Sequence, residues 1–317
     1  MDDYTRRTTD QLITESLTFA GAVAIDGARA VGKTESARRF SKSELRLDSS
    51  DPLAILSREQ PTVALAGDTP RLLDEWQMVP ELWNEVRHAV DARRSVGQFI
   101  LSGSAAPDLT PLRHSGAGRF AHVRMRTMTF TETEHSTGQV SLRALLQGET
   151  IAPVQSEVDF EGVVRRIITG GWPGWQTLDE GEAQQRALAY VTDLVEHDFP
   201  TLAGSGRDPR RFRALLRGLA ALVAQPASLA AMQRRVNETE HISAGDQLIR
   251  TLVDIAQRMY VLEDQAAWSP KLRSRTTAMQ TPNDIWQIRR LRRHFWAPAP
   301  RGCCESAKHS ATSSNHR

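Results

Sequence analysis

The fold is decided by Gly27-Ala28-Arg29-Ala30-Val31-Gly32-Lys33-Thr34. This stretch fits the phosphate-binding pattern G-x-x-x-x-G-K-[ST] at every position. The apolar run 22–26 before it is typical of a buried parallel strand, and residues 35–40 after it begin a helix. The order predicts a loop whose eight residues cradle phosphates at the amino end of a helix. A chance match in a glycine-rich turn is the alternative, and the two fitting flanks disfavour it.

Two side chains of this loop have predicted roles toward a nucleotide. Lys33 is expected to reach the β- and γ-phosphates, and the hydroxyl of Thr34 is expected to bind Mg²⁺. Asp74 and Glu75 directly follow the apolar pair Leu72-Leu73, as an acid-bearing strand requires. We predict that Asp74 completes the Mg²⁺ shell and that Glu75 orients and deprotonates the attacking water. The alternative is a solvated acidic pair at a helix start, where acids are favoured.

Further polar residues follow the next strand. Residues 97–101 are predicted to form a strand that ends in three apolar residues and leads into Ser102-Gly103-Ser104. If this strand lies beside the acid-bearing strand, Ser102 or Ser104 could hydrogen-bond to the γ-phosphate or the attacking water. A simple turn is the alternative. Two glycines then precede Arg119, which could act as an arginine finger on the γ-phosphate of its own or a neighbouring subunit. A surface turn with a solvated arginine explains these residues equally well.

Taken together, these segments resemble the AAA+-type predicted ATPases of bacteria and archaea that carry a C-terminal domain of unknown function. The resemblance runs from about residue 15 to about residue 280. The segments that carry it are Gly27–Thr34, Arg71–Gln77, Val79–Trp83, Phe99–Ser104, His114–Arg119 and Met128–Glu132. The Asp-Glu-Trp-Gln and Ser-Gly-Ala-Gly-Arg stretches within them are far more specific than the loop alone.

The resemblance implies a fold and a ligand. The fold is an α/β P-loop NTPase domain, with a parallel sheet flanked by helices, followed by a mostly helical second domain with a winged-helix-like unit. The ligand is ATP with Mg²⁺. The resemblance also favours Arg119 as the arginine finger. Such a finger often acts in trans, so a homo-oligomer is one expectation, although the sequence indicates no interface. The family usually has threonine where Ser102 stands, and serine retains the hydroxyl.

Composition limits the class of protein. The 317 residues allow about two domains, and 40% hydrophobic with 25% charged residues is ordinary for a globular chain. No apolar run approaches the roughly 18 residues that span a bilayer, and the first residues lack the apolar core of a signal peptide. We therefore expect a cytoplasmic protein with no membrane partner. Cys303 and Cys304 are adjacent, which suits neither a disulfide framework nor a metal site.

We predict an ATPase domain at 1–146, a linker at 147–158, a helical domain at 159–282 and a tail at 283–317 without regular structure. In the helical domain, the Gly-Gly-Trp-Pro turn at 170–173 is expected to be a packing corner.

A winged helix-turn-helix is predicted within this helical domain. Its helices are expected at 212–223, 229–236 and 244–259, with a strand at 260–262. The third helix offers only two arginines against two aspartates, a weak basis for DNA binding, so a packing or protein contact is favoured.

The basic character of the chain belongs to its end. Residues 271–317 hold ten basic and two acidic side chains, whereas the other 270 residues hold thirty and thirty-six. The family resemblance also stops near residue 282. We therefore predict that a frameshift or truncation replaced the last part of the second domain.

Three functions remain open at this stage. The first is a Mg²⁺-dependent ATPase that couples hydrolysis to a conformational change in its C-terminal domain. The second is a nucleotide-gated module with little turnover that regulates a protein or DNA partner. The third is a truncated remnant that has lost its effector part.

Overall fold

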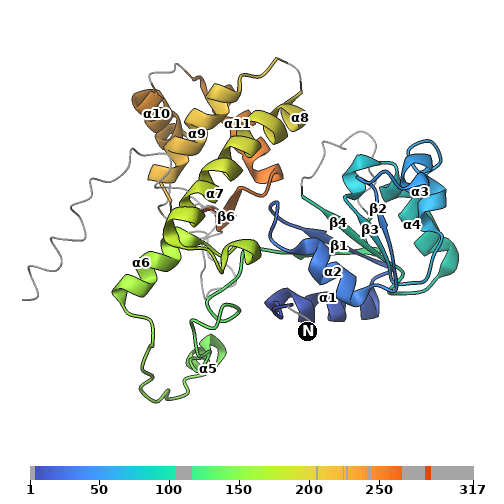
Figure 1. Cartoon of the computed structure of the whole chain (residues 1–317), viewed down its shortest axis with the longest axis horizontal. Helices are drawn as coiled ribbons and strands as arrows, with labels where there is room; N and C mark the ends of the chain where they lie inside the picture. Colours follow the sequence, from blue (N-terminus) through green and yellow to red (C-terminus); the bar gives the residue numbers. More distant parts are fainter. Residues whose placement is uncertain are drawn as a thin grey trace, which may run out of the picture. The chain divides into compact units, whose positions relative to one another are not determined.

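The structure is a computed structural model that describes residues 4–104, 116–204, 206–223, 225, 228–240, 244–265 and 283–286. The chain divides into two compact units (Figure 1). The first unit contains the described residues up to 178 together with 256–261, and the second contains those of 179–255 and from 262 onward. Among the described residues, no helix combines the length and apolar character needed to cross a membrane.

A five-stranded sheet forms the centre of the first unit. Its strands are β1 (Ala22–Asp26), β2 (Ser43–Arg46), β3 (Arg71–Asp74), β4 (Phe99–Gly103) and β5 (Phe120–Arg124). Their order is β2-β3-β4-β1-β5, and every neighbouring pair is parallel. The predicted parallel α/β fold is therefore confirmed, and β1 has the predicted bounds. All five strands present their carboxyl ends at one edge of the sheet, which places the following loops together.

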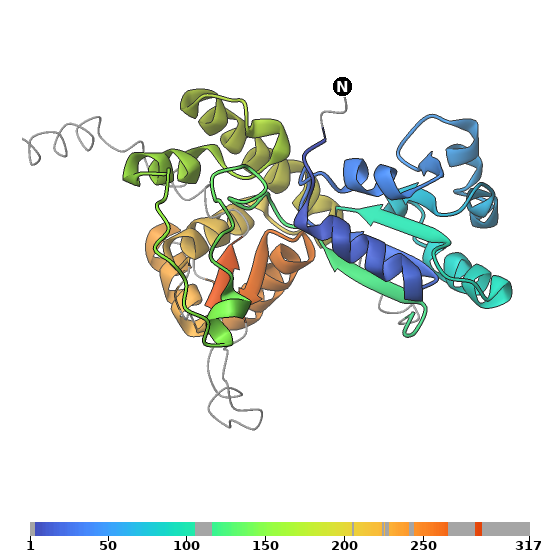
Figure 2. The ribbon, with the colours of Figure 1, turned by 90° about the horizontal axis from the view of Figure 1, so that it is seen from below.

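Helices cover both faces of this sheet, as a parallel sheet requires. The helices are α1 (Thr8–Phe19), α2 (Lys33–Phe40), α3 (Pro52–Leu56) and α4 (Leu82–Arg93). A 3₁₀ turn, η1 (Pro61–Leu65), lies between α3 and β3 in the chain. Ala22 and Ala24 of β1 share a buried cluster with α4, α3 and η1. Val23 and Ile25 alternate with them and are fully buried outside that cluster, while α1 and α2 contact β1. Figure 2 shows α1 lying along the strands.

The first unit continues beyond the sheet through α5 (Leu142–Leu146), α6 (Phe160–Thr169) and a 3₁₀ turn, η3 (Pro173–Trp175). Residues 147–158, the predicted linker, form no helix or strand. The division between the units falls after residue 178, later than that linker. The division falls later because the turn at 170–173 packs against the sheet domain, where the indole N–H of Trp172 donates to the carbonyl of Arg29.

The second unit is mostly helical, as predicted. Its elements are α7 (Glu180–Asp193), a π-helical turn η4 (Leu194–Asp198), α8 (Phe199–Ala203), α9 (Pro209–Ala221), α10 (Leu229–Glu240), most of α11 (Asp246–Arg258), β6 (Leu262–Gln265) and β7 (Asn283–Trp286). Phe199 and Phe212 stack in its core, with ring centroids 4.4 Å apart. The bounds of α9, α10 and α11 agree to within four residues with those of the three helices expected for the winged helix-turn-helix.

A short strand occurs where the tail was expected to lack regular structure. Residues Asn283–Trp286 form β7, which pairs antiparallel with β6. The strand depends on this backbone ladder with a distant segment, and local composition does not reveal such a partner. The remaining predicted tail, 287–317, lies outside the described residues.

Candidate functional site

The loop 27–34 connects β1 to α2 at the carboxyl edge of the sheet, as predicted. Gly32 precedes the helix with φ +97°, a conformation that side chains rarely adopt. A Cβ at Gly27 would lie 2.2 Å from the carbonyl oxygen of Met125. Both glycines are therefore required by the backbone path. Helix α2 begins at Lys33, so its unpaired N–H groups and positive dipole end face the loop.

Lys33 lies inside the loop with only 5% of its surface exposed. Its Nζ donates hydrogen bonds to the carbonyl oxygens of Gly27, at 3.0 Å, and Ala28, at 2.8 Å. Burial lowers the pKa of Lys33 to about 8, although the nearby carboxylates of Glu75 and Asp74 oppose the shift. A buried cation held by loop carbonyls is available to bind an anion that enters the loop.

Asp74 and Thr34 meet at the same edge. Asp74 is the last residue of β3 and is 2% exposed. Thr34 Oγ1 donates to both carboxylate oxygens of Asp74, at 3.0 and 3.1 Å. Burial raises the pKa of Asp74, and the hydrogen bond from Thr34 partly offsets this. The pair supplies a carboxylate and a hydroxyl, oxygen ligands that suit Mg²⁺.

This donor set suits a metal that arrives with a nucleotide. Among the described residues, no group of three or more His, Cys, Asp or Glu side chains could hold a metal by itself. Mg²⁺ typically takes one or two protein ligands and completes its shell with phosphate oxygens and water. The buried charge of Asp74, which lacks a cationic hydrogen-bond partner in the described structure, also fits a site that a cation stabilises.

Ser102 lies between the loop strand and the acid-bearing strand. Strand β4 is inserted between β1 and β3, and Ser102 is opposite Asp74 on one side and Ile25 on the other. Its Oγ is buried, and no group in the described part of the chain meets the geometry of a hydrogen bond to it. It is nevertheless near enough to Asp74 to favour the ionised carboxylate. A buried hydroxyl without a partner is suited to a ligand.

Glu75 follows Asp74 in a left-handed backbone conformation, with φ +53° and ψ +44°. This conformation is uncommon for residues other than glycine and marks a constrained position. The amide of Gln77 donates to the Glu75 carboxylate, and Ser104 Oγ donates to the same oxygen at 3.5 Å. Ser104 therefore contacts the predicted catalytic acid, whereas Ser102 lies beside the metal-binding Asp74.

Arg119 lies at the opposite edge of the sheet. Its carbonyl oxygen accepts from the N–H of Ala22, the first residue of β1, at 3.1 Å. The rise along β1 separates this point from the loop by about 13 Å. The guanidinium is 41% exposed and pairs with Asp91 at 2.7 Å. In this geometry Arg119 does not reach the loop of its own chain, and an exposed arginine paired with Asp91 also fits the surface-turn alternative.

Two residues outside the predicted set hold the loop. Arg7 Nη1 donates to the carbonyl of Val31 at 2.7 Å, and the indole N–H of Trp172 donates to the carbonyl of Arg29 at 3.1 Å. Arg7 also forms a buried ion pair with Glu132 at 3.2 Å. The family resemblance included Glu132 without a role, and Trp172 was expected only to pack. No local pattern marks Arg7.

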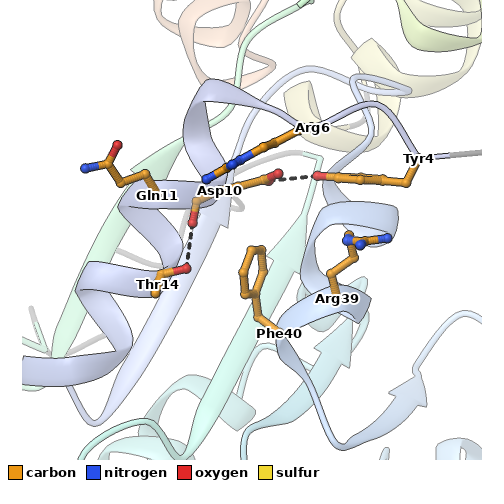
Figure 3. Close-up of a pocket in the computed structure, with 7 residues that line it drawn as sticks. All are labelled: Tyr4, Arg6, Asp10, Gln11, Thr14, Arg39 and Phe40. Atoms are coloured by element: carbon orange, nitrogen blue, oxygen red, sulfur yellow. Dashed lines mark hydrogen bonds between the residues drawn. The ribbon is translucent and has the colours of Figure 1, made fainter. Parts of the chain in front are cut away.

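A pocket of about 450 Å³ opens between the amino-terminal segment, α1 and α2 (Figure 3). Its lining mixes charges with aromatic rings and consists of Tyr4, Arg6, Asp10, Gln11, Thr14, Arg39 and Phe40. The Tyr4 hydroxyl lies 2.7 Å from Asp10 Oδ1 and 2.6 Å from Ser36 Oγ, on the helix that follows the loop. The pocket contains none of the residues predicted to bind phosphates.

Comparisons with known proteins agree with this geometry. Residues 20–134 match a family described as an AAA domain, and residues 161–282 match a domain of unknown function. Two uncharacterised proteins, from Mycobacterium bovis and Mycobacterium tuberculosis, are each 32% identical over 135 residues. That match covers 41% of this chain and 31% of each relative, so it spans about a third of their length.

Among solved structures, a Walker-type ATPase of Pyrococcus abyssi has a similar fold. The TM-score is 0.56 at 14% identity, and the match covers 91% of this chain and 95% of the other. At that identity the likeness concerns the fold. Residues 20–134 therefore match an AAA domain, residues 161–282 match a domain of unknown function, and the chain shares the fold of a Walker-type ATPase.

Proposed function

We propose that this protein binds ATP with Mg²⁺ and hydrolyses it, and that hydrolysis changes the conformation of its C-terminal domain. The observation that carries the proposal is the meeting of Thr34 and Asp74 beside the buried Lys33. The ammonium of Lys33 can neutralise phosphate charge. The hydroxyl of Thr34 and the carboxylate of Asp74 can bind the metal ion that accompanies a triphosphate. The AAA domain supports nucleotide binding, and the choice of ATP follows the family resemblance.

Each residue has a proposed task. The N–H groups of residues 27–34 bind the phosphates, and Lys33 neutralises charge on the β- and γ-phosphates. Thr34 and Asp74 would hold Mg²⁺, which when bound stabilises the charge that develops on the phosphate oxygens. The hydroxyl of Ser102 would contact the γ-phosphate or the attacking water, because it is buried and lies opposite Asp74 at the carboxyl edge.

Glu75 is the proposed base. It would accept a proton from water as the water oxygen bonds to the γ-phosphorus, while the bond from that phosphorus to the bridging oxygen breaks and ADP leaves with the electron pair. Its carboxylate is held by Gln77 and Ser104 in the described structure. Glu75 must therefore exchange these partners for water when the nucleotide is bound.

Arg119 is proposed to stabilise the transition state in a neighbouring subunit. It is too far from the loop of its own chain, and its exposed guanidinium is accessible to a second copy. The proposal therefore includes a homo-oligomer, with the active site completed between two chains.

The test is ATP turnover by the purified full chain with Mg²⁺. We expect turnover in the unmutated protein, none in Lys33→Ala, and a kcat lower by about 10²-fold or more in Glu75→Gln. Lys42→Ala and Glu81→Gln are the matched controls, because both side chains are exposed and neither is proposed to bind or act on the nucleotide. Turnover that survives Lys33→Ala would contradict the proposed site.

A nucleotide-gated module with slow turnover is the second candidate. The observation that favours it is that Glu75 is held by Gln77 and Lys33 by the loop's own carbonyls. Tight ATP binding without turnover would support it. Its partner would be a protein in preference to DNA, because α11 carries Asp246 and Asp254 beside Arg250 and Arg258. A protease-sensitive second unit would instead support a truncated remnant.

A further inference from the structure

The phosphate loop is held from outside by two hydrogen bonds to its carbonyl groups. One comes from Arg7, which precedes α1, and ends on the carbonyl of Val31. The other comes from Trp172, in the turn after α6, and ends on the carbonyl of Arg29. Both donors are almost completely buried, Arg7 at 5% and Trp172 at 0% exposure. Two segments that are distant in the sequence thus each donate a hydrogen bond to the same loop, at carbonyl groups two residues apart.

The direction of these carbonyls determines the direction of two N–H groups. In a trans peptide the C=O and the following N–H point in opposite directions. The N–H of Ala30 therefore points away from Trp172, and the N–H of Gly32 points away from Arg7. Backbone N–H groups are the donors with which such a loop binds phosphates. The two outer hydrogen bonds therefore orient two of the inner donors.

The backbone between the two held carbonyls is constrained. Ala30 has φ +61°, a left-handed conformation that costs free energy in a residue other than glycine. Such a conformation persists only where its surroundings enforce it. Both holding segments also pack beside Gly32, since a Cβ there would lie 3.3 Å from Arg7 Nη1 and 3.5 Å from Pro173 Cγ.

Arg7 is itself fixed by an extended set of contacts. Its Nε pairs with Glu132 Oε1 at 3.2 Å, and its Nη2 donates to the carbonyl of Arg126 at 2.6 Å. Glu132 also accepts from the N–H groups of Thr8 and Thr129, both at 2.6 Å. Burial would raise the pKa of Glu132, but these hydrogen bonds and the charge of Arg7 outweigh it, so the net pKa is lowered. The guanidinium is therefore held rigidly against the loop.

Trp172 is held by its own turn. Its ring stacks on Trp175, with centroids 4.5 Å apart, and its carbonyl accepts from the Gln176 side chain at 2.9 Å. Met128 N–H donates to the carbonyl of Gly171 at 2.6 Å, and a Cβ at Gly171 would lie 2.6 Å from Met128 O. The Gly-Gly-Trp sequence thus allows the turn to approach the sheet domain closely enough for the indole to reach the loop.

We propose that Arg7 and Trp172 are positioning residues that aim the N–H groups of Ala30 and Gly32 at the phosphates of a bound nucleotide. The proposal rests on the proposed nucleotide binding. Trp172 lies within the segment that matches the domain of unknown function. The nucleotide site of the AAA domain is therefore complete only when the beginning of the second family domain is present.

The test removes the donor of Trp172 and keeps its ring. Trp172 is replaced in the full chain by 3-benzothienylalanine, in which sulfur stands in place of the indole N–H. We expect the Kd for Mg-ATP and for Mg-ADP to rise about five- to tenfold, the value of one hydrogen bond. The melting temperature without nucleotide should fall by no more than a few degrees, as the loss of one hydrogen bond predicts. The kcat at saturating ATP should change less than twofold, because Glu75 is untouched.

Matched variants separate positioning from packing. The same replacement at Trp175 alters the neighbouring ring of the turn, and we expect its Kd to change less than twofold. Arg7→Lys retains a charge beside Glu132 but loses the forked guanidinium, and we expect a Kd increase like that at Trp172.

The outcomes are distinct. An unchanged Kd in both the Trp172 and Arg7 variants, or a lower melting temperature with an unchanged Kd, overturns the inference and leaves the proposed function standing. No binding of Mg-ATP by the unmutated protein overturns the proposed function, and the inference with it.

Discussion

The two edges of the central sheet carry predicted site residues in very different settings. At the carboxyl edge, Lys33, Asp74 and Ser102 are buried and converge within one chain. At the amino edge, Arg119 is 41% exposed and pairs with Asp91. The difference teaches that the residues proposed to bind a nucleotide lie together within one chain, whereas the proposed finger lies at the other edge of the sheet, from which it is proposed to act on a second chain.

The largest effect is expected at the amino edge. Arg119→Ala should lower kcat by about 10³-fold, because the proposed finger stabilises transition-state charge, while the Kd for ATP stays unchanged. Mixing Arg119→Ala with Lys33→Ala should restore about a quarter of the activity, because one in four randomly formed sites joins an intact loop to an intact finger. Steady-state turnover measures both. No recovery on mixing would contradict action across subunits.

A somewhat smaller effect is expected at the proposed base. Glu75→Gln should lower kcat by about 10²-fold or more, since the amide cannot accept the proton from water. ATP binding, measured by equilibrium titration, should change little, because the Glu75 carboxylate hydrogen-bonds to Gln77 and Ser104 and is proposed to act on water instead of the phosphates. Gln77→Ala is the informative companion, and we expect it to retain binding. A loss of binding in Glu75→Gln would instead place this residue among the phosphate ligands.

ATP binding at the carboxyl edge should depend on the protonation state of Lys33. Its pKa in the unliganded protein is lowered to about 8, so above that pH the lysine is neutral and must take up a proton when it binds phosphates. We expect the Kd for ATP to be constant near pH 7 and to rise by up to about tenfold per unit above pH 8. Calorimetric titration in buffers of different ionisation enthalpy measures the proton uptake. Binding without it up to pH 9.5 would exclude this role.

The smallest effect concerns stability. Burial raises the pKa of Asp74, so the native state binds its proton more tightly than the unfolded chain, and this group's contribution to stability falls as pH rises through the native pKa. Asp74→Asn should therefore stabilise the unliganded protein at pH 7 by about 1 kcal/mol and weaken Mg-ATP binding. Asp91→Asn, at the exposed edge, is the control and should change stability less than Asp74→Asn does, because exposed ion pairs contribute little. Urea unfolding measures both.

Local patterns predicted much of the carboxyl edge. The apolar run 22–26 became β1, the loop leads into α2, and Asp74 ends β3, because apolar runs and glycines act within a few residues. The neighbouring position of β4 and the acid-bearing β3 was predicted from the order of the segments, but the pairing of β4 with β1 joins distant segments and was not predicted.

The contacts that hold the loop were beyond local patterns for the same reason. Arg7 is 125 residues from Glu132, and Trp172 is 143 residues from Arg29. The position of Arg119 at the far edge likewise depends on the register of β5 with β1. A turn rich in glycine and tryptophan predicted packing but could not indicate what it would pack against.

Equilibrium titration of the full chain with ATP, with and without Mg²⁺, tests most directly whether the carboxyl edge of one chain binds the nucleotide. The account predicts saturable binding of one ATP per chain, strengthened by Mg²⁺, abolished by Lys33→Ala and unaffected by Arg119→Ala. No binding, or equal binding by the Lys33→Ala protein, would contradict it.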